Sequence, residues 1–185
     1  NALLANTTAD NNTAVGFGAG YSTTTGSTNT FIGEESGFWN TTGSSNTALG
    51  ADAYAGSNTA TGSYNTAIGK SALTANTTGD VNVAVGTNAL AANTTASNNV
   101  AIGKDALIAN TTGNTNIAIG TDALTTNVAG DRNVAIGEQA LQNLNPSGNV
   151  DTYNVAVGYN AGLSVTTGIN NTLIGGLAGD ALTSS

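Results

Sequence analysis

The chain of 185 residues contains no cysteine, no histidine and no methionine. Disulfide bonds, thiol chemistry and histidine-based metal or acid–base sites are therefore excluded. Only Lys70, Lys104 and Arg132 are basic, and the net charge is −8. Nucleic acids and anionic membranes attract basic surfaces, so this balance argues against both as partners. No stretch reaches the roughly 18 apolar residues that a membrane-spanning helix needs.

What the sequence does contain is a repeat. Ten copies of a short motif end in Gly, with Val, Ile or Leu directly before it and Asn four residues before it. The glycines are Gly16, Gly33, Gly50, Gly69, Gly86, Gly103, Gly120, Gly137, Gly158 and Gly175. The asparagines are Asn12, Asn29, Asn46, Asn65, Asn82, Asn99, Asn116, Asn133, Asn154 and Asn171. A disordered tract rich in Asn and Thr would not keep this register, so we expect an ordered array.

The usual spacing of 17 residues between motifs decides the architecture. Helical repeats usually need more than about 30 residues and propeller blades about 40 or more, whereas 17 residues suit one coil of a β-solenoid. We expect an all-β parallel β-roll with two short strands and two turns per coil. Residues 1–185 would form a single array of ten to eleven coils. Because the chain begins and ends within the pattern, we interpret it as a segment of a longer polypeptide.

Strand alternation places Ile117 and Ile119 on one face and Ala118 on the other. We expect the Val, Ile or Leu before each Gly to be the core residue, and the Ala to allow close backbone approach. A Leu column, including Leu107, becomes Gly at both ends of the chain. Phe31 and Leu173 replace the strand Ala there, which suggests that one column compensates the volume lost in its neighbour. The thin apolar core also predicts lateral association with other chains.

Asn and Gly are poor strand residues, so we expect them at the corners of each coil. Gly would permit a positive φ or a close neighbour that leaves no room for a Cβ. Asn would bond its own turn or pair with the Asn of the coils above and below it. These twenty residues are therefore predicted to form a structural ladder.

The stretch "NTAIGKSALTANTTGDVNVAVGTNALAA" (65–92) resembles the head repeats of trimeric autotransporter adhesins, the YadA-like head family. Val134-Ala135-Ile136-Gly137 and Ala140 match that family's pattern. The resemblance covers essentially the whole chain and implies a left-handed parallel β-roll in a homotrimer. The family's unit is shorter, and it often has Ser where this chain always has Asn. The longer unit also looks like repeats of marine phage tail-fibre proteins, as in "YNVAVGYNAG" (153–162).

We find no catalytic, metal or cofactor-binding constellation in the sequence and expect no enzyme and no cofactor. Asp52, Asp105 and Asp122 share one repeat position and are interpreted as a solvated edge. The sequence Asn-Thr-Thr occurs five times in the chain, and we interpret four of these glycosylation sequons as turn chemistry. These sequons begin at Asn40, Asn76, Asn93 and Asn110.

Aromatic residues are concentrated in the first third of the chain. Phe38, Trp39 and Tyr54 are candidate ligand contacts, because exposed aromatic rings stack on sugars. The favoured alternative is that the aromatic residues fill a core widened by Gly20 and Gly37, or pack between chains. Insertions at 57–64 and 144–153 lengthen two coils, and such loops are where binding variation concentrates.

The sequence thus predicts a structural and adhesive fibre segment that presents or forms a receptor-binding surface. We expect it outside the cell, in a virion tail fibre or on a bacterial surface. Its partners would be two further copies of itself and a glycan or protein receptor, with no nucleic acid and no membrane contact. The alternatives are a ligand-binding solenoid, for ice or polysaccharide, and a subunit of an extracellular filament.

Overall fold

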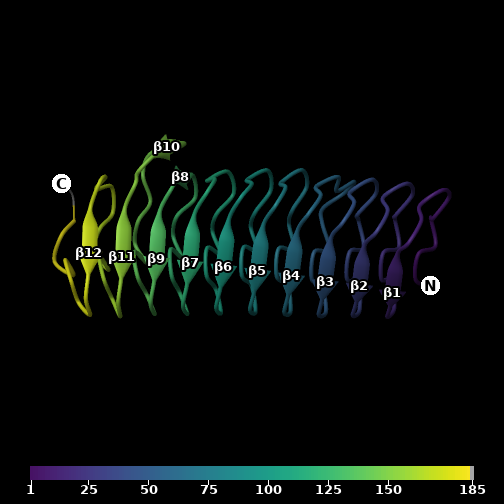
Figure 1. Cartoon of the computed structure of the whole chain (residues 1–185), viewed down its shortest axis with the longest axis horizontal. Helices are drawn as coiled ribbons and strands as arrows, with labels where there is room; N and C mark the ends of the chain where they lie inside the picture. Colours follow the sequence, from purple (N-terminus) through teal and green to yellow (C-terminus); the bar gives the residue numbers. More distant parts are fainter. Residues whose placement is uncertain (184–185) are drawn as a thin grey trace.

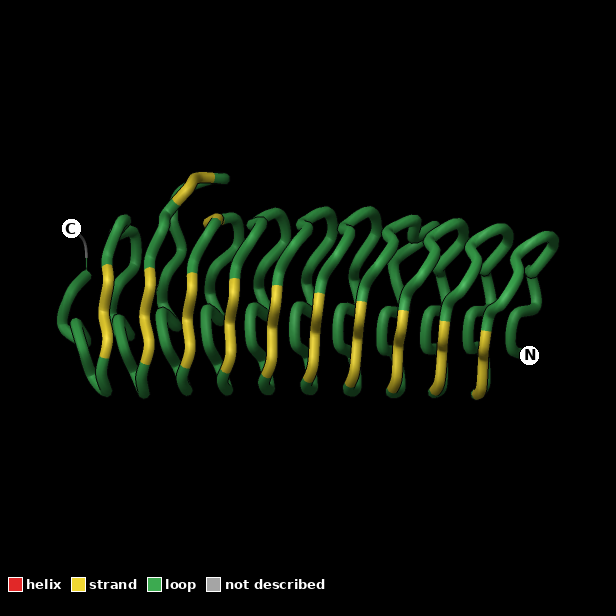
Figure 2. Tube along the Cα trace, viewed as in Figure 1, coloured by secondary structure: helices red, strands yellow, loops and turns green. Residues whose placement is uncertain are grey.

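One three-residue strand from each coil stacks on the next to form a ten-stranded parallel sheet along a rod (Figure 1, Figure 2). The structure is a computed structural model that describes residues 1–183, so the last two residues of the predicted array lie outside it. The sheet strands are β1 (Thr13–Val15), β2 (Thr30–Ile32), β3 (Thr47–Leu49), β4 (Thr66–Ile68), β5 (Val83–Val85), β6 (Val100–Ile102), β7 (Ile117–Ile119), β9 (Val134–Ile136), β11 (Val155–Val157) and β12 (Thr172–Ile174). This confirms the predicted all-β parallel β-solenoid.

Each coil contributes one strand to this sheet, not the two that the sequence predicted, and within residues 1–183 further strands occur only in the short two-stranded sheet described below. The rest of the coil is a chain of turns, and no helix occurs among residues 1–183. The turns nevertheless stack through the backbone: the Leu107 amide donates to the Ala123 carbonyl (3.0 Å) and the Thr111 amide to the Val128 carbonyl (2.9 Å). Stacking therefore continues around the coil where the backbone is too curved for a strand.

The curvature comes from residues in the left-handed backbone region at fixed positions of the coil. The closing glycine Gly120 has φ +138°, and a Cβ there would lie 2.4 Å from the Gly137 carbonyl oxygen of the next coil. Two and four residues later, Asp122 and Leu124 have φ of 57° and 52°. A left-handed conformation costs a residue other than Gly roughly 1–2 kcal/mol, and burial of the Leu side chain offsets that cost.

The core lies on the Ala side of the strands, which corrects the prediction that Val, Ile or Leu would be the core residue. Ala101 and Ala118 are completely buried, whereas Ile102 and Ile117 keep 38% and 36% of their surface exposed. The middle residue of a three-residue strand is the only one that points into the coil. It packs there beside the buried Leu107 column, so the narrow interior accommodates Ala and turns the larger side chains outward.

At the ends of the rod the two core columns, the middle residue of each strand and the position of Leu107, differ in side-chain size from those of the middle coils. Phe31 is fully buried in the strand column. A Cβ at Gly37 would lie 2.5 Å from the Phe31 ring. A Cβ at Gly179 would likewise lie 2.8 Å from the Leu173 side chain. These contacts agree with the compensation expected from the sequence: the larger residue occupies the space that Leu fills in the middle coils.

The insertion at 144–153 leaves the regular coil and forms a separate two-stranded parallel sheet. Its strand β10 (Val150–Asp151) pairs with β8 (Gly130–Asp131) of an earlier coil. Figure 1 shows β10 standing out from the rod, above the upper bends of the neighbouring coils. The shorter insertion at 57–64 stays close to the rod, held by a bridge between Asn40 and Ala60.

Candidate interaction surfaces

The ten asparagines of the repeat run through the structure as one hydrogen-bonded column. The Asn99 amide donates to Asn82 Oδ1 of the preceding coil (3.0 Å), and Asn99 Nδ2 donates to the Gly113 carbonyl (2.9 Å). The same amide-to-Oδ1 bond links each of the nine neighbouring pairs, from Asn12–Asn29 to Asn154–Asn171, at 2.8–3.2 Å. Asn at this position therefore connects one coil to the next.

A second buried Asn column lies beside the first and was not anticipated from the sequence. Asn93 Nδ2 donates to Asn76 Oδ1 (2.8 Å) of the preceding coil and to the Ala96 carbonyl (3.0 Å) of its own turn. The four sequon asparagines belong to this column and are fully buried. Their burial leaves them inaccessible to modification in the folded chain. The recurrence of Asn76, Asn93, Asn110 and Asn127 was the signal, because these residues keep the same 17-residue spacing.

The outward face of the ten-stranded sheet, here called the sheet face, carries no charge. It consists of the first and third residues of each sheet strand, and all of them are Thr, Val, Ile or Leu. Val15 and Leu49 expose 59% and 45% of their surface. With strands about 4.8 Å apart, the sheet face is about 43 Å long. An exposed apolar surface of this extent marks a site of interaction.

The three aromatic residues predicted as ligand contacts lie in different environments. Trp39 is exposed and meets the half-buried Phe38 edge-on, with ring centroids 5.0 Å apart. Phe38 also stacks in parallel on Tyr21 of the preceding coil at 4.8 Å. Tyr54, in contrast, is fully buried and donates to the Gly62 carbonyl (2.7 Å). Burial raises the pKa of Tyr54 to about 12, and the prediction that it contacts a ligand is wrong.

The stacked rings form part of a cleft of about 370 Å³ near the N-terminal end of the rod. It lies within the usual size range of small-molecule sites, roughly 300–1,000 Å³. Gly18 and Glu35 both form part of its lining. The cleft is lined by Asn1, Leu4, Phe17, Gly18, Tyr21, Glu35 and Phe38.

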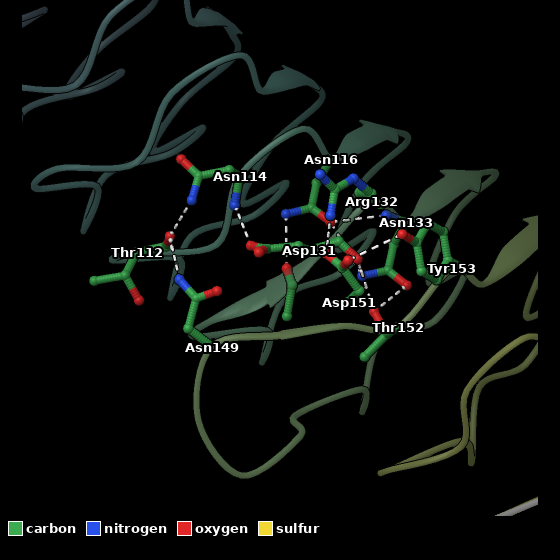
Figure 3. Close-up of polar contacts among 11 residues, drawn as sticks. Thr112, Asn114, Asn116, Asp131, Arg132, Asn133, Asn149, Asp151, Thr152 and Tyr153 are labelled. Atoms are coloured by element: carbon green, nitrogen blue, oxygen red, sulfur yellow. Dashed lines mark hydrogen bonds and ion pairs between the residues drawn. The ribbon is translucent and has the colours of Figure 1, made fainter.

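The insertion at 144–153 is held against the rod by polar contacts (Figure 3). Arg132 forms an ion pair with Asp151, and its guanidinium lies 5.7 Å from the centre of the Tyr153 ring. Tyr153 Oη donates to the second Asp151 oxygen (2.9 Å). The Asp151 charge raises the pKa of Arg132. The network fixes the insertion and satisfies its charges internally, so we assign it a structural role.

Among residues 1–183 there is no cluster of three or more side chains suited to hold a metal ion, and no helix that could cross a membrane. Comparisons with known proteins give no match. No protein-family model fits the chain, and none of the curated proteins or solved structures matches it. The sheet face and the aromatic cleft are the features of the rod that point to a function.

Proposed function

We propose that the chain is a segment of an extended fibre, made of three copies of itself, that attaches a particle or cell to a surface. The observation that carries this proposal is the sheet face: an uncharged, largely aliphatic surface that spans all ten strands. Burial of apolar surface is the main driving force for association, at about 25 cal/mol per Å². A face of this kind is best explained as one that is covered in the working assembly.

Another copy of the chain is the partner that fits this face. A partner must be uncharged where it touches the sheet face, because a charge buried there would have no counter-ion. The surface of the partner must also repeat about every 4.8 Å, so that its side chains match those of the sheet face along the whole rod. The sheet face of a second copy meets both conditions. The proposal of three chains and of a left-handed coil is based on the resemblance to the YadA-like head repeats.

The attachment role is supported by the way residues vary between coils. The interior positions repeat, whereas the aromatic cluster around Phe38 and the insertion at 144–153 each occur once. In a rigid rod, such single features are the places where a receptor, either a glycan or a protein, would be recognised. A repeating rod with a few single features fits an extracellular fibre of a phage tail or of a bacterial surface. The resemblance to the YadA-like head repeats and to phage tail-fibre repeats favours the same role.

A second candidate function, ice binding, is favoured by one detail of the same face. The strands β1 to β4 begin with Thr and end with Val, Ile or Leu, so Thr and aliphatic side chains form two straight outward columns. A flat, uncharged and regularly spaced surface is what an ice-binding solenoid would expose. In that case the sheet face would have to remain free in solution.

Two matched substitutions test the fibre proposal. Ile102 on the sheet face and Val128 on a turn are 38% and 37% exposed. We expect Ile102→Asp to dissociate the assembly and Val128→Asp to leave it intact, as measured by light scattering. Dissociation by both variants, or by neither, would argue against the sheet face as the interface. A monomeric parent chain with thermal hysteresis would favour ice binding.

A further inference from the structure

The cleft near the N-terminal end exists because the second residue after the closing glycine is itself a glycine, Gly18, in the first coil. The second residue after the closing glycine is polar in most coils, as in Glu35, Asp52 and Asn88, but it is Gly18 in the first. A Cβ added to Gly18 would lie 3.0 Å from the Phe38 ring and 3.4 Å from Glu35 Cγ. Any larger side chain at position 18 would extend into the space between these residues. The cleft is thus a local departure from the repeat.

The residues around this space are also unlike those of the other coils. Tyr21 and Phe38 occupy equivalent positions in successive coils, where their parallel rings form one continuous wall. Phe17 is the most exposed of the aromatic residues, at 69%. Among residues 1–183, no hydrogen bond or ion pair of the structure involves the Glu35 carboxylate. An apolar aromatic wall and an unpaired acceptor therefore face the same small space.

We propose that this cleft binds a neutral sugar ring, such as a terminal residue of a surface glycan. The C–H face of the sugar would pack on the aromatic wall, while its hydroxyls would donate to Glu35 and bond the Tyr21 hydroxyl. A quaternary ammonium ion would also contact the aromatic rings. It has no N–H or O–H, however, with which to donate a hydrogen bond to the Glu35 carboxylate or the Tyr21 hydroxyl. The inference rests on the attachment function proposed above for its biological purpose, and on the cleft alone for its chemistry.

The test measures binding of neutral methyl glycosides, in gluco, galacto and manno configurations, to the whole chain by saturation-transfer NMR and fluorescence titration. Gly18→Asn should abolish binding, because the Asn side chain fills the cleft. Asn88 and Asn160 occupy the same position of other coils with φ of 57° and 53°, close to the +66° of Gly18. The backbone conformation at position 18 is therefore one that Asn adopts in this fold, and an unchanged melting temperature would verify that the Phe38 ring accommodates the new side chain.

A matched pair of aromatic substitutions supplies the control. Phe17 and Tyr159 both follow a closing glycine and are both exposed, at 69% and 54%, but only Phe17 lines the cleft. We expect Phe17→Ala to weaken binding about tenfold and Tyr159→Ala to leave it unchanged. Binding that survives Gly18→Asn, equal effects of the two aromatic substitutions, or binding of tetramethylammonium alone would overturn the proposal.

The cleft and the fibre can fail separately. A chain that assembles but binds none of the glycosides would overturn the sugar site and leave the fibre proposal standing. A monomer that binds sugar in a Gly18-dependent way would support the cleft and contradict the fibre. If Phe17→Ala dissociates the assembly, Phe17 belongs to the interface between chains and the sugar site is overturned.

Discussion

Phe31 occupies the space beside Gly37 that a Leu side chain fills in the middle coils. A Cβ at Gly37 would come within 2.5 Å of the Phe31 ring, so the two positions share one volume. The equivalent pair in a middle coil is Ala101 and Leu107, both fully buried. The same interior is therefore filled in two ways, by Phe with Gly or by Ala with Leu.

This relationship predicts a compensating double substitution. Phe31→Ala alone leaves a cavity and should cost about 3–5 kcal/mol of unfolding free energy. Gly37→Leu alone overpacks the coil and should cost about 1–3 kcal/mol or more. The double variant recreates the Ala–Leu pair of the middle coils and should be more stable than the sum of the single effects predicts. Denaturant unfolding of all four chains measures the coupling, and additive effects would contradict a shared volume.

The Asn column should matter more for stability than the residue that precedes it. Asn116→Ala removes the acceptor of the Asn133 amide (3.0 Å) and the donor to the Gly130 carbonyl (2.8 Å), both buried. Leaving these groups unpaired should cost about 2–4 kcal/mol. Thr115 is exposed, so Thr115→Ala is the control and should change stability little. Thermal unfolding compares the two, and equal losses would mean that the column is not stabilising.

The closing glycines should resist substitution where an insertion glycine does not. Gly120 combines φ +138° with a carbonyl oxygen 2.4 Å from the place of a Cβ, whereas Gly148 has φ +88° and nothing within 4 Å. Gly120→Ala should cost at least about 3 kcal/mol, from backbone strain and displacement of the next coil. Gly148→Ala should cost only about 1–2 kcal/mol, from the left-handed backbone alone. Circular dichroism melting curves check this, and a Gly120→Ala variant as stable as Gly148→Ala would contradict it.

The sequence predicted the coil, its period and the strand before each closing glycine, because Asn and Gly recur at places where the chain must bend. The second strand that it predicted for each coil was wrong. It did not determine which face of the strand points inward. Alternation separates Ala118 from Ile119, but both are apolar, and side-chain size alone favours Ile119 as the core residue. The width of the coil determines which face of the strand points inward. That width depends on how the turns opposite the strand fold. Residue spacing alone does not reveal it.

Parts of the candidate sites could have been read from the repeat and others could not. Tyr54 lies four residues after Gly50, at the position of Leu107 in its own coil, so the alignment contained the signal for its burial. The absence of a side chain at Gly18 was equally visible. The cleft itself was not predictable, because it also needs Phe38 of the next coil to pack beside Gly18.

Tyr54 also predicts a loss of stability at alkaline pH. Burial raises its pKa in the folded chain from 10.0 to about 12, so the folded state holds this proton more tightly than the unfolded state. The stabilisation is complete below pH 10 and is lost as the pH rises towards 12, by about 2–3 kcal/mol. Tyr54→Phe removes the titrating hydroxyl. Melting temperatures between pH 9 and 12 should fall less steeply for that variant, and parallel curves would contradict the assignment.

The central claim is that the sheet face is buried between copies of the chain. Sedimentation equilibrium of the purified chain over a range of concentrations tests it most directly. The account predicts a single species with three times the chain mass of 18.0 kDa, which Ile102→Asp converts to monomer while Val128→Asp does not. A folded parent chain that sediments as a monomer at every concentration would contradict it.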